Sequence, residues 1–355
     1  LGADVDLMSL VPVKRSHSVC AQGGINSVNA LTRQQGDNEW KHLDDTVYGG
    51  GGNDRICGGD GADSLTGFGN LNGNDDDDVL VGGVPAYSTL GRIAAGLMPP
   101  SDGEVRVDGK SVNTLSADEA RDARLKIQMI FQDPYASLNP RLRVEEIIGE
   151  AARVHGLTDR TGFADYVAAQ MQRAGLDPAL RDRYPHQFSG GQRQRIGIAR
   201  ALAVQPSMLV CDEAVAALDV SIQAQILNLF MDLREQLNLT YLFISHDLGV
   251  VEHLSDRVVI MYLGRVVESA PAEEVFRRPN HPYTQTLLAE IPRLSARHKT
   301  FTAIQGEMPS PLNPPTGCHF HPRCPHAMPR CKTETPTLRG IAVNHISACH
   351  LNDIQ

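Results

Sequence analysis

The sequence has few aromatic residues, no long apolar run and no excess of positive charge, and each absence excludes a class of protein. One Trp and an aromatic content of 5% argue against an aromatic-rich binding surface. No run of about 18 apolar residues occurs, so we expect no membrane-spanning helix. The chain does not start with a basic stretch followed by an apolar one, so we expect no signal peptide. With 33 Lys and Arg against 42 Asp and Glu, it also lacks the basic excess of a nucleic-acid-binding protein.

The negative charge is concentrated near the N-terminus. The 355 residues, enough for two or three domains, carry a net charge of −9. Residues 1–83 contain 5 Lys and Arg but 13 Asp and Glu, whereas the remaining residues contain 28 and 29. An acidic N-terminal part therefore precedes a balanced body, and this asymmetry indicates two parts with different origins or different roles.

The run LVCDEA at 209–214 predicts a buried strand that ends in two carboxylates. Open α/β sheets bind their ligands at the carboxyl ends of the strands, so both side chains are candidates for a site. Asp212 is suited to hold Mg²⁺, and Glu213 is suited to polarise an attacking water.

A second pattern lies upstream, in FSGGQRQRIGIARALA at 188–203. Ser189, Gly190 and Gly191 open a predicted helix, where backbone N–H groups and the positive end of the helix dipole suit an anion. A Ser-Gly-Gly helix start shortly before a strand ending in Asp-Glu is typical of the ATP-binding cassette (ABC) family. Residues from about 88 to 355 resemble that family.

Three further segments resemble the family in the expected order: the glutamine loop MIFQDPYASLNPR (129–141), AALD (216–219) and ISHD (244–247). The resemblance implies that two such domains meet head to tail around two ATP molecules with Mg²⁺. It gives three residues catalytic roles, namely Gln132 toward Mg²⁺ and water, Glu213 on the water, and His246 on the γ-phosphate. The nucleotide-binding residues that it implies are Ser88, Thr89, Gln132, Ser189, Gly190, Gly191, Gln192, Asp212 and Asp219, of which Ser88, Gln132 and Asp212 would serve Mg²⁺.

The segments RRPNHPYTQTLLAEIP (277–292) and GCHFHPRCPHAMPRC (317–331) resemble the ATPase subunits of dipeptide and oligopeptide importers. The implied fold is an α/β, P-loop NTPase-like ATPase domain at 84–275, with a helical subdomain and an incomplete β-subdomain. A small cysteine-containing extension follows at 276–355. The implied activity is ATP hydrolysis coupled to peptide import. The implied partners are membrane permease subunits and a second ATPase subunit, identical or different, on the cytoplasmic face of the membrane.

Four of the seven Cys residues cluster near the C-terminus with the spacing C-x5-C-x6-C-x17-C: Cys318, Cys324, Cys331 and Cys349. In a chain without a secretion signal, such a cluster of cysteines favours a metal site over disulfides. Ligand type alone suits Zn²⁺ and a 4Fe–4S cluster equally. The wide spacings are unlike those of zinc fingers and favour the cluster, which the importer ATPases can also bind. An empty set of reduced thiols remains the alternative.

The phosphate loop is where the sequence departs from the family. The subfamily loop resembles LVGESGCGKSTLGR, whereas residues 80–92 read LVGGVPAYSTLGR, one residue shorter. If the two loops are aligned on STLGR, Tyr87 stands in the position of the lysine. If they are aligned on LVG, Pro85 falls in a glycine position. Glycines let successive N–H groups turn toward phosphates, and Pro has no N–H. The first strands of the β-subdomain and its adenine-stacking aromatic residue are also missing, which leaves GEVRVDGK (103–110) as one strand pair. We expect severely weakened ATP binding and hydrolysis close to zero.

Two N-terminal segments resemble other families. RSHSVCAQGGIN (15–26) resembles the flavoprotein subunit of succinate dehydrogenase and fumarate reductase, which attaches flavin to the histidine matching His17. The dinucleotide-binding half is absent, so FAD is not expected and residues 1–48 are predicted to be poorly ordered.

Residues 49–83 are rich in Gly and Asp and contain the nonapeptides GGGGNDRIC and GGDGADSLT. These resemble the calcium-binding repeats of RTX proteins, in which Asp54 and Asp63 would bind Ca²⁺ in a short β-roll. A flexible acidic linker is the alternative. We interpret the chain as a chimera. A second functional hypothesis is a calcium-dependent binding or assembly module on a passive cassette scaffold.

Overall fold

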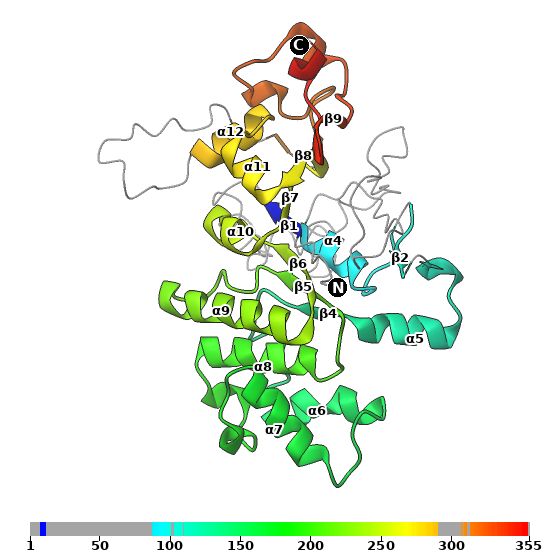
Figure 1. Ribbon diagram of the computed structural model, residues 1–355, viewed down its shortest axis with the longest axis vertical. Helices are drawn as coiled ribbons and strands as arrows, with labels where there is room; N and C mark the ends of the chain where they lie inside the picture. The colour runs from blue at the N-terminus through cyan, green and yellow to red at the C-terminus, as the bar shows by residue number, and fades with distance from the viewer. Residues whose placement is uncertain are drawn as a thin grey trace, which may run out of the picture.

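The computed structural model describes residues 8–11, 87–100, 103–108, 110–289, 307, 309–310 and 313–353. The flavoprotein-like run with His17 and the calcium-repeat residues Asp54 and Asp63 lie outside these ranges, so both interpretations remain predictions. Figure 1 shows a central sheet with a group of helices at one end and the C-terminal extension at the other.

An eight-stranded sheet forms the centre, in the order β4-β5-β6-β1-β7-β8-β10-β9. The strands from β4 to β7 in this order are parallel, whereas β8, β10 and β9 each run antiparallel to their neighbours. The strand bounds are Met8–Val11 (β1), Ile127–Ile130 (β4), Met208–Asp212 (β5), Thr240–Ile244 (β6), Arg257–Tyr262 (β7), Arg265–Pro271 (β8), Arg339–Ala342 (β9) and His345–Ser347 (β10).

Helices cover both faces of the parallel part of the sheet (Figure 1). Their bounds are Tyr87–Ala94 (α4), Ala117–Lys126 (α5), Val144–Val154 (α6), Phe163–Arg173 (α7), Gly190–Leu202 (α8), Val220–Leu237 (α9), Leu248–Leu254 (α10), Ala272–Arg277 (α11) and Pro282–Ala289 (α12). Single 3-10 turns lie at Val112–Thr114, Pro178–Leu180, Pro185–Gln187, His321–Arg323, Pro329–Lys332 and His350–Asp353.

The strands β5 and β6 are apolar throughout because each packs on two sides. Leu209 and Phe243 belong to the core that includes α6, α7, α8 and α9, whereas Val210 and Leu242 belong to the core under α4. Alternate residues of a strand point to opposite faces, so a strand with helices on both faces buries every side chain. This covered sheet confirms the predicted α/β class and fixes the carboxyl ends of β5 and β6 side by side.

Helix α9 packs one apolar side against the core. Ile226 and Leu233 are buried, and the helix ends at Asn238, which adopts the left-handed conformation with φ of 52°. Asn tolerates this conformation better than most residues with a side chain, so it is suited to end a helix. In the adjoining helical group, a Cβ at Gly149 of α6 would lie 2.4 Å from the ring of Phe163, so glycine permits the close contact of α6 with α7.

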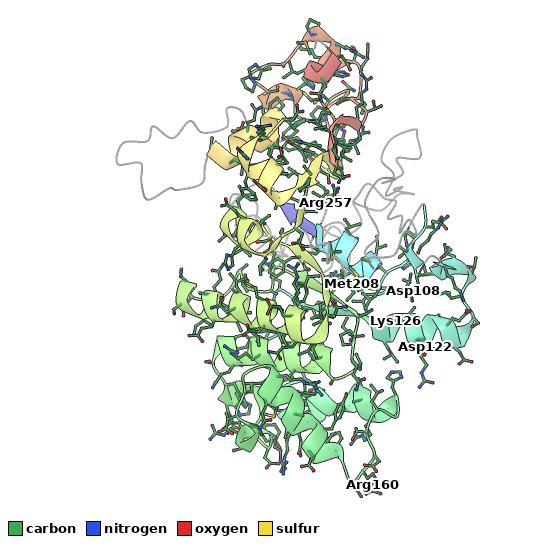
Figure 2. The ribbon with its side chains drawn as sticks, in the orientation of Figure 1. Asp108, Asp122, Lys126, Arg160, Met208 and Arg257 are labelled. Carbon is green, nitrogen blue, oxygen red and sulfur yellow. The ribbon has the colours of Figure 1, made fainter. Side chains whose placement is uncertain are left out.

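The segment GEVRVDGK forms the predicted strand pair. Arg106–Val107 (β2) and Lys110–Ser111 (β3) make a two-stranded antiparallel sheet that is separate from the central sheet. An ion pair between Lys126 of α5 and Asp108 in the turn holds this hairpin to α5 (Figure 2). Within the described ranges the β-subdomain is therefore reduced to one hairpin, as the sequence predicts.

Strand β1 was not predicted. Met8–Val11 lies between β6 and β7 and is parallel to both. Four residues carry too little periodicity to predict a strand from the sequence alone. Among the described residues, no helix is long and apolar enough to cross a membrane.

Candidate nucleotide and cysteine sites

Ser88 and Asp212, which are distant in the sequence, meet at the carboxyl end of β5. Asp212 is the last residue of β5 and is only 3% exposed. Ser88 lies in the first turn of α4, and its Oγ donates a hydrogen bond to Oδ1 of Asp212 over 2.9 Å. The neighbouring Thr89 is buried. The structure thus brings together the hydroxyl and the carboxylate that the sequence predicts for Mg²⁺, and both are oxygen ligands of the kind this cation prefers.

Burial dominates the ionisation of Asp212. It raises the pKa of Asp212 from 3.8 to about 6; the negative charge of Glu213 adds to the rise, whereas the Ser88 hydroxyl and the Arg92 charge oppose it. Without a metal ion, the folded chain therefore holds a carboxylate in an environment that disfavours its charge.

We expect Asp212→Asn to stabilise the metal-free chain at pH 7 to 8 by about 2–3 kcal/mol. The pKa is higher in the folded chain than in the unfolded one, so the folded chain binds more protons between pH 3.8 and about 6. Its stability therefore falls as pH rises through this window, and an uncharged Asn avoids the loss. Urea unfolding at pH 4 and pH 8 measures the effect, which should be smaller at pH 4. An equal gain at both pH values would contradict it.

Glu213 is held by two side chains from other segments. Nε2 of Gln132, which follows β4, donates to Oε2 of Glu213 over 2.6 Å. Nδ1 of His246, which follows β6, lies 3.3 Å from Oε1. The three predicted catalytic residues therefore converge next to the Ser88–Asp212 pair. Glu213 itself has φ of 47°, a conformation that costs a residue with a side chain about 1–2 kcal/mol. Such local strain is often kept at functional sites.

The predicted anion-binding helix start is present at α8. Ser189 caps the helix, its Oγ accepts from the N–H of Gln192, and the Gln192 side chain accepts from the N–H of Ser189. A Cβ at Gly191 would lie 2.5 Å from Ile222 of α9, so this glycine also serves helix packing. Asp219 is exposed just before α9. In the described part of the chain, no hydrogen bond or ion pair joins Ser189 or Asp219 to the Glu213 cluster.

The four C-terminal cysteines converge on one small cavity of about 10 Å³. Its lining includes Cys318, Cys324, Cys331 and Cys349. The N–H of Cys318 donates to the carbonyl of Cys331 over 2.8 Å. A Cβ on the preceding Gly317 would lie 2.5 Å from that carbonyl oxygen, so only glycine allows this approach.

Burial raises the pKa of the Cys349 thiol to about 11, with further increases from the charges of the other cysteines. Burial likewise raises the pKa values of Cys318 and Cys324. These thiols therefore stay protonated at neutral pH unless a cation stabilises the thiolates. Four cysteine thiolates are a ligand set that Zn²⁺ and iron–sulfur clusters both accept. The cavity has room for about one water. No group of three or more Cys, His, Asp or Glu side chains in the described ranges has the arrangement of a metal site.

Sequence reasoning missed the histidines around these cysteines. His281, His321, His326 and His350 line the same cavity. Burial lowers the pKa of His281 to about 4, so this ring is neutral. The alternation of His and Cys in HFHPRCPH was the available signal for two of them, but His281 and His350 come from separate segments.

Two comparisons with protein families cover this region. Residues 87–216 match the family described as "ABC transporter", and residues 267–331 match "Oligopeptide/dipeptide transporter, C-terminal region". The chain is 48% identical over 268 residues to the oligopeptide transport ATP-binding protein AppF of Bacillus subtilis, a match that spans 74% of this chain and 82% of that protein. It is 49% identical over 266 residues to the oligopeptide transport ATP-binding protein OppF of Salmonella typhimurium, spanning 74% and 79%.

The chain belongs to the oligopeptide-transport ATP-binding proteins of the ABC transporter family. Among solved structures, cbiO1 from Clostridium perfringens, part of the ABC transporter complex cbiONQ, shares 29% identity at a TM-score of 0.48, covering 54% of this chain and 74% of that chain. The family match begins at Tyr87, the last residue of the altered phosphate loop. In this ABC protein the match includes the glutamine loop (129–141), the Ser-Gly-Gly start of α8 and the strand β5 with the two carboxylates at its end, whereas residues 82–86 lie outside it.

Proposed function

We propose that this chain is the ATP-binding subunit of an importer for dipeptides or oligopeptides. It acts at the cytoplasmic face of the membrane with permease subunits and a second ATPase subunit. The observation that carries the proposal is the convergence of Gln132, Glu213 and His246 beside the Ser88–Asp212 pair. Bound ATP would supply the phosphoryl group, and Mg²⁺ would neutralise its charge. Of the protein's own groups, Ser88 and Asp212 serve the metal and Glu213 orients the water.

Two parts of the chain would contribute to nucleotide binding, the phosphate loop and the start of α8, and only the second is intact. The last two glycines and the lysine of the phosphate loop are missing, whereas the capped start of α8 is complete. In a head-to-tail dimer each ATP lies between the phosphate loop of one subunit and the Ser-Gly-Gly helix start of the other. We therefore expect this chain to contribute its α8 to the site of an intact partner subunit and to leave its own site inactive.

A mixed complex tests this function. We expect this chain, together with permease subunits and an intact ATPase subunit of a related importer, to support peptide uptake into proteoliposomes. Ser189→Arg should abolish uptake, because the bulky cation occupies the anion position in the partner's site. Asp232→Asn, at an exposed position of α9, is the control for changes to the surface. Failure of the mixed complex to take up any peptide would contradict the proposal, and so would full uptake by the Ser189→Arg complex.

We also propose that the four cysteines bind a 4Fe–4S cluster. The proposal is supported by the thiol donor set and by the resemblance of residues 317–331 to the importer ATPases. Because the cavity is small, the cysteine loops would have to separate to admit the cluster. Iron and sulfide analysis of chain purified without oxygen tests the assignment, and zinc found in place of iron would overturn it.

The N-terminal nonapeptides support a second proposal, a calcium-binding segment joined to the cassette. Two consecutive repeats fit the calcium-binding pattern, and the acidic composition changes at about residue 84. A calorimetric signal at millimolar Ca²⁺ that is lost when Asp54 and Asp63 are both changed to Asn is the expected result. A single continuous transcript across residues 45–95 would support a natural fusion as the origin of the chimera.

A further inference from the structure

The cysteine cavity is assembled from two parts of the chain that are fixed in different ways. Cys318, Cys324 and Cys331 lie within one loop region, where the N–H of Cys318 donates to the carbonyl of Cys331 and the N–H of Cys324 to that of His321. Cys349 comes from a separate segment, after β10. The segment that carries it needs its own attachment if four thiols are to face one cavity.

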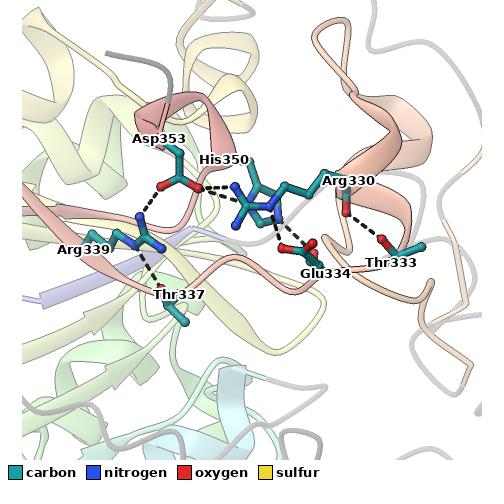
Figure 3. A network of polar contacts seen from close by, with 7 residues as sticks. All are labelled: Arg330, Thr333, Glu334, Thr337, Arg339, His350 and Asp353. Atoms are coloured by element: carbon teal, nitrogen blue, oxygen red, sulfur yellow. Dashed lines mark hydrogen bonds and ion pairs between the residues drawn. The ribbon is translucent and has the colours of Figure 1, made fainter.

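That attachment centres on Asp353 (Figure 3). Its Oδ2 accepts from Nη1 of Arg330 over 2.6 Å, and its Oδ1 pairs with Nη1 of Arg339. Arg330 directly precedes Cys331, whereas Asp353 lies in the 3-10 turn that follows Cys349. One carboxylate thus joins the chain segments of the third and fourth cysteines.

Neighbouring contacts turn this pair of ion pairs into a network. Nε of Arg330 also contacts Oε2 of Glu334 over 2.5 Å. The ring of His350 donates through Nε2 to the carbonyl of Glu334 over 2.9 Å, and its Nδ1 lies 3.6 Å from Asp353. The Asp353 side chain is 16% exposed, although both arginines are about half exposed. A shared carboxylate with several partners holds its position better than an isolated surface pair.

We propose that Asp353 is a positioning residue for the cysteine site: it clasps the segment of Cys349 against that of Cys331, so that the fourth thiol faces the cavity before any metal binds. The role of this clasp rests on the proposed metal site, but its effect on the position of Cys349 can be measured in the metal-free protein. Without the carboxylate, the 3-10 turn at 350–353 should open locally and carry Cys349 away from the cavity.

The test is the alkylation rate of each cysteine in the reduced, metal-free full chain, measured with iodoacetamide and peptide mass spectrometry. We expect Asp353→Ala to raise the rate at Cys349 by about tenfold, because local opening exposes it. The rate at Cys211, which is buried in β5, should change by less than about twofold, since the domain stays folded. Asp353→Asn, which keeps the shape but loses the charge, should give a smaller rise.

Asp182→Ala is the matched control, because it removes a carboxylate from the exposed Arg143–Asp182 pair, remote in sequence from the cysteines. An unchanged rate at Cys349 in Asp353→Ala would overturn the clasp, and so would an equal rise at Cys211. A separate zinc titration should show weaker binding by Asp353→Ala than by the parent chain. Absence of zinc and iron binding in the parent would overturn the proposed metal site, whereas the clasp is decided by alkylation alone.

Discussion

ATP hydrolysis by the purified chain is expected to be at least about 1000-fold slower than that of an intact importer ATPase. The γ-phosphate is normally held by a lysine and by a ring of backbone N–H groups from the phosphate loop. Here residues 82–87 read GGVPAY, so the lysine is absent and Pro85 lacks an N–H. Glu213 and His246 lie together, but we expect the chain to hold weakly the phosphate on which they are proposed to act.

Replacing residues 82–87 with the seven residues GESGCGK should restore part of the activity. Tyr87→Lys alone should restore little, because the loop would remain one residue short and without its last two glycines. Recovery in the graft should be incomplete, since the described residues contain only the β2–β3 hairpin of the β-subdomain. Phosphate release with and without ATP regeneration measures the rates.

The matched control combines the graft with Glu213→Gln, which removes the carboxylate that acts on water and should return hydrolysis to the background. Turnover of the unaltered chain within about tenfold of an intact relative would contradict the prediction. It would mean that β1 or another segment replaces the phosphate loop.

The second large effect is expected at Glu268, a fully buried carboxylate on β8. It lies 2.8 Å from Nε2 of His345 on β10 and accepts from the N–H groups of Asn280 and His281, which precede α12. Glu268 thus joins the central sheet to the C-terminal helix and hairpin. Glu268→Ala should destabilise this region by about 3–5 kcal/mol, because it leaves His345 and two N–H groups buried without acceptors.

Urea unfolding monitored by far-ultraviolet circular dichroism measures the change. Glu273→Ala is the control, because that carboxylate is 81% exposed and its pair with Arg277 should contribute less than about 0.5 kcal/mol. Equal stability of Glu268→Ala and Glu273→Ala would contradict the stabilising role of Glu268 between the sheet, α12 and β10.

The same carboxylate sets a pH dependence. Burial alone would raise its pKa, but hydrogen bonds from His345 and from two backbone N–H groups outweigh burial and hold the pKa of Glu268 below 4.5. A lowered pKa adds stability above pH 4.5, and this stability is lost as pH falls through the folded value. The stability difference between the parent chain and Glu268→Gln should therefore shrink in acid.

The catalytic cluster was predictable from the sequence because each member lies in a local motif. Glu213 directly follows an apolar strand, so the α/β sheet rule places it at the carboxyl edge of the sheet. Gln132 and His246 were identified because the segments that contain them resemble motifs of the family. Glu268 was not predictable, since its partners come from positions 280, 281 and 345 and no periodicity links them. The clasp at Asp353 was not predictable for the same reason, because no sequence pattern links this Asp to Arg330 and Arg339.

The burial of Asp212 makes the proposed Mg²⁺ site a place where a proton and the metal ion would compete. With the pKa of Asp212 raised to about 6, the folded chain carries a proton there in mild acid. At the proposed Mg²⁺ site, Asp212 would hold the ion as a carboxylate, so binding of Mg²⁺ would require loss of that proton. Magnesium affinity should then fall by up to about tenfold for each pH unit below 6, so the metal occupancy of this subunit follows the acidity around it.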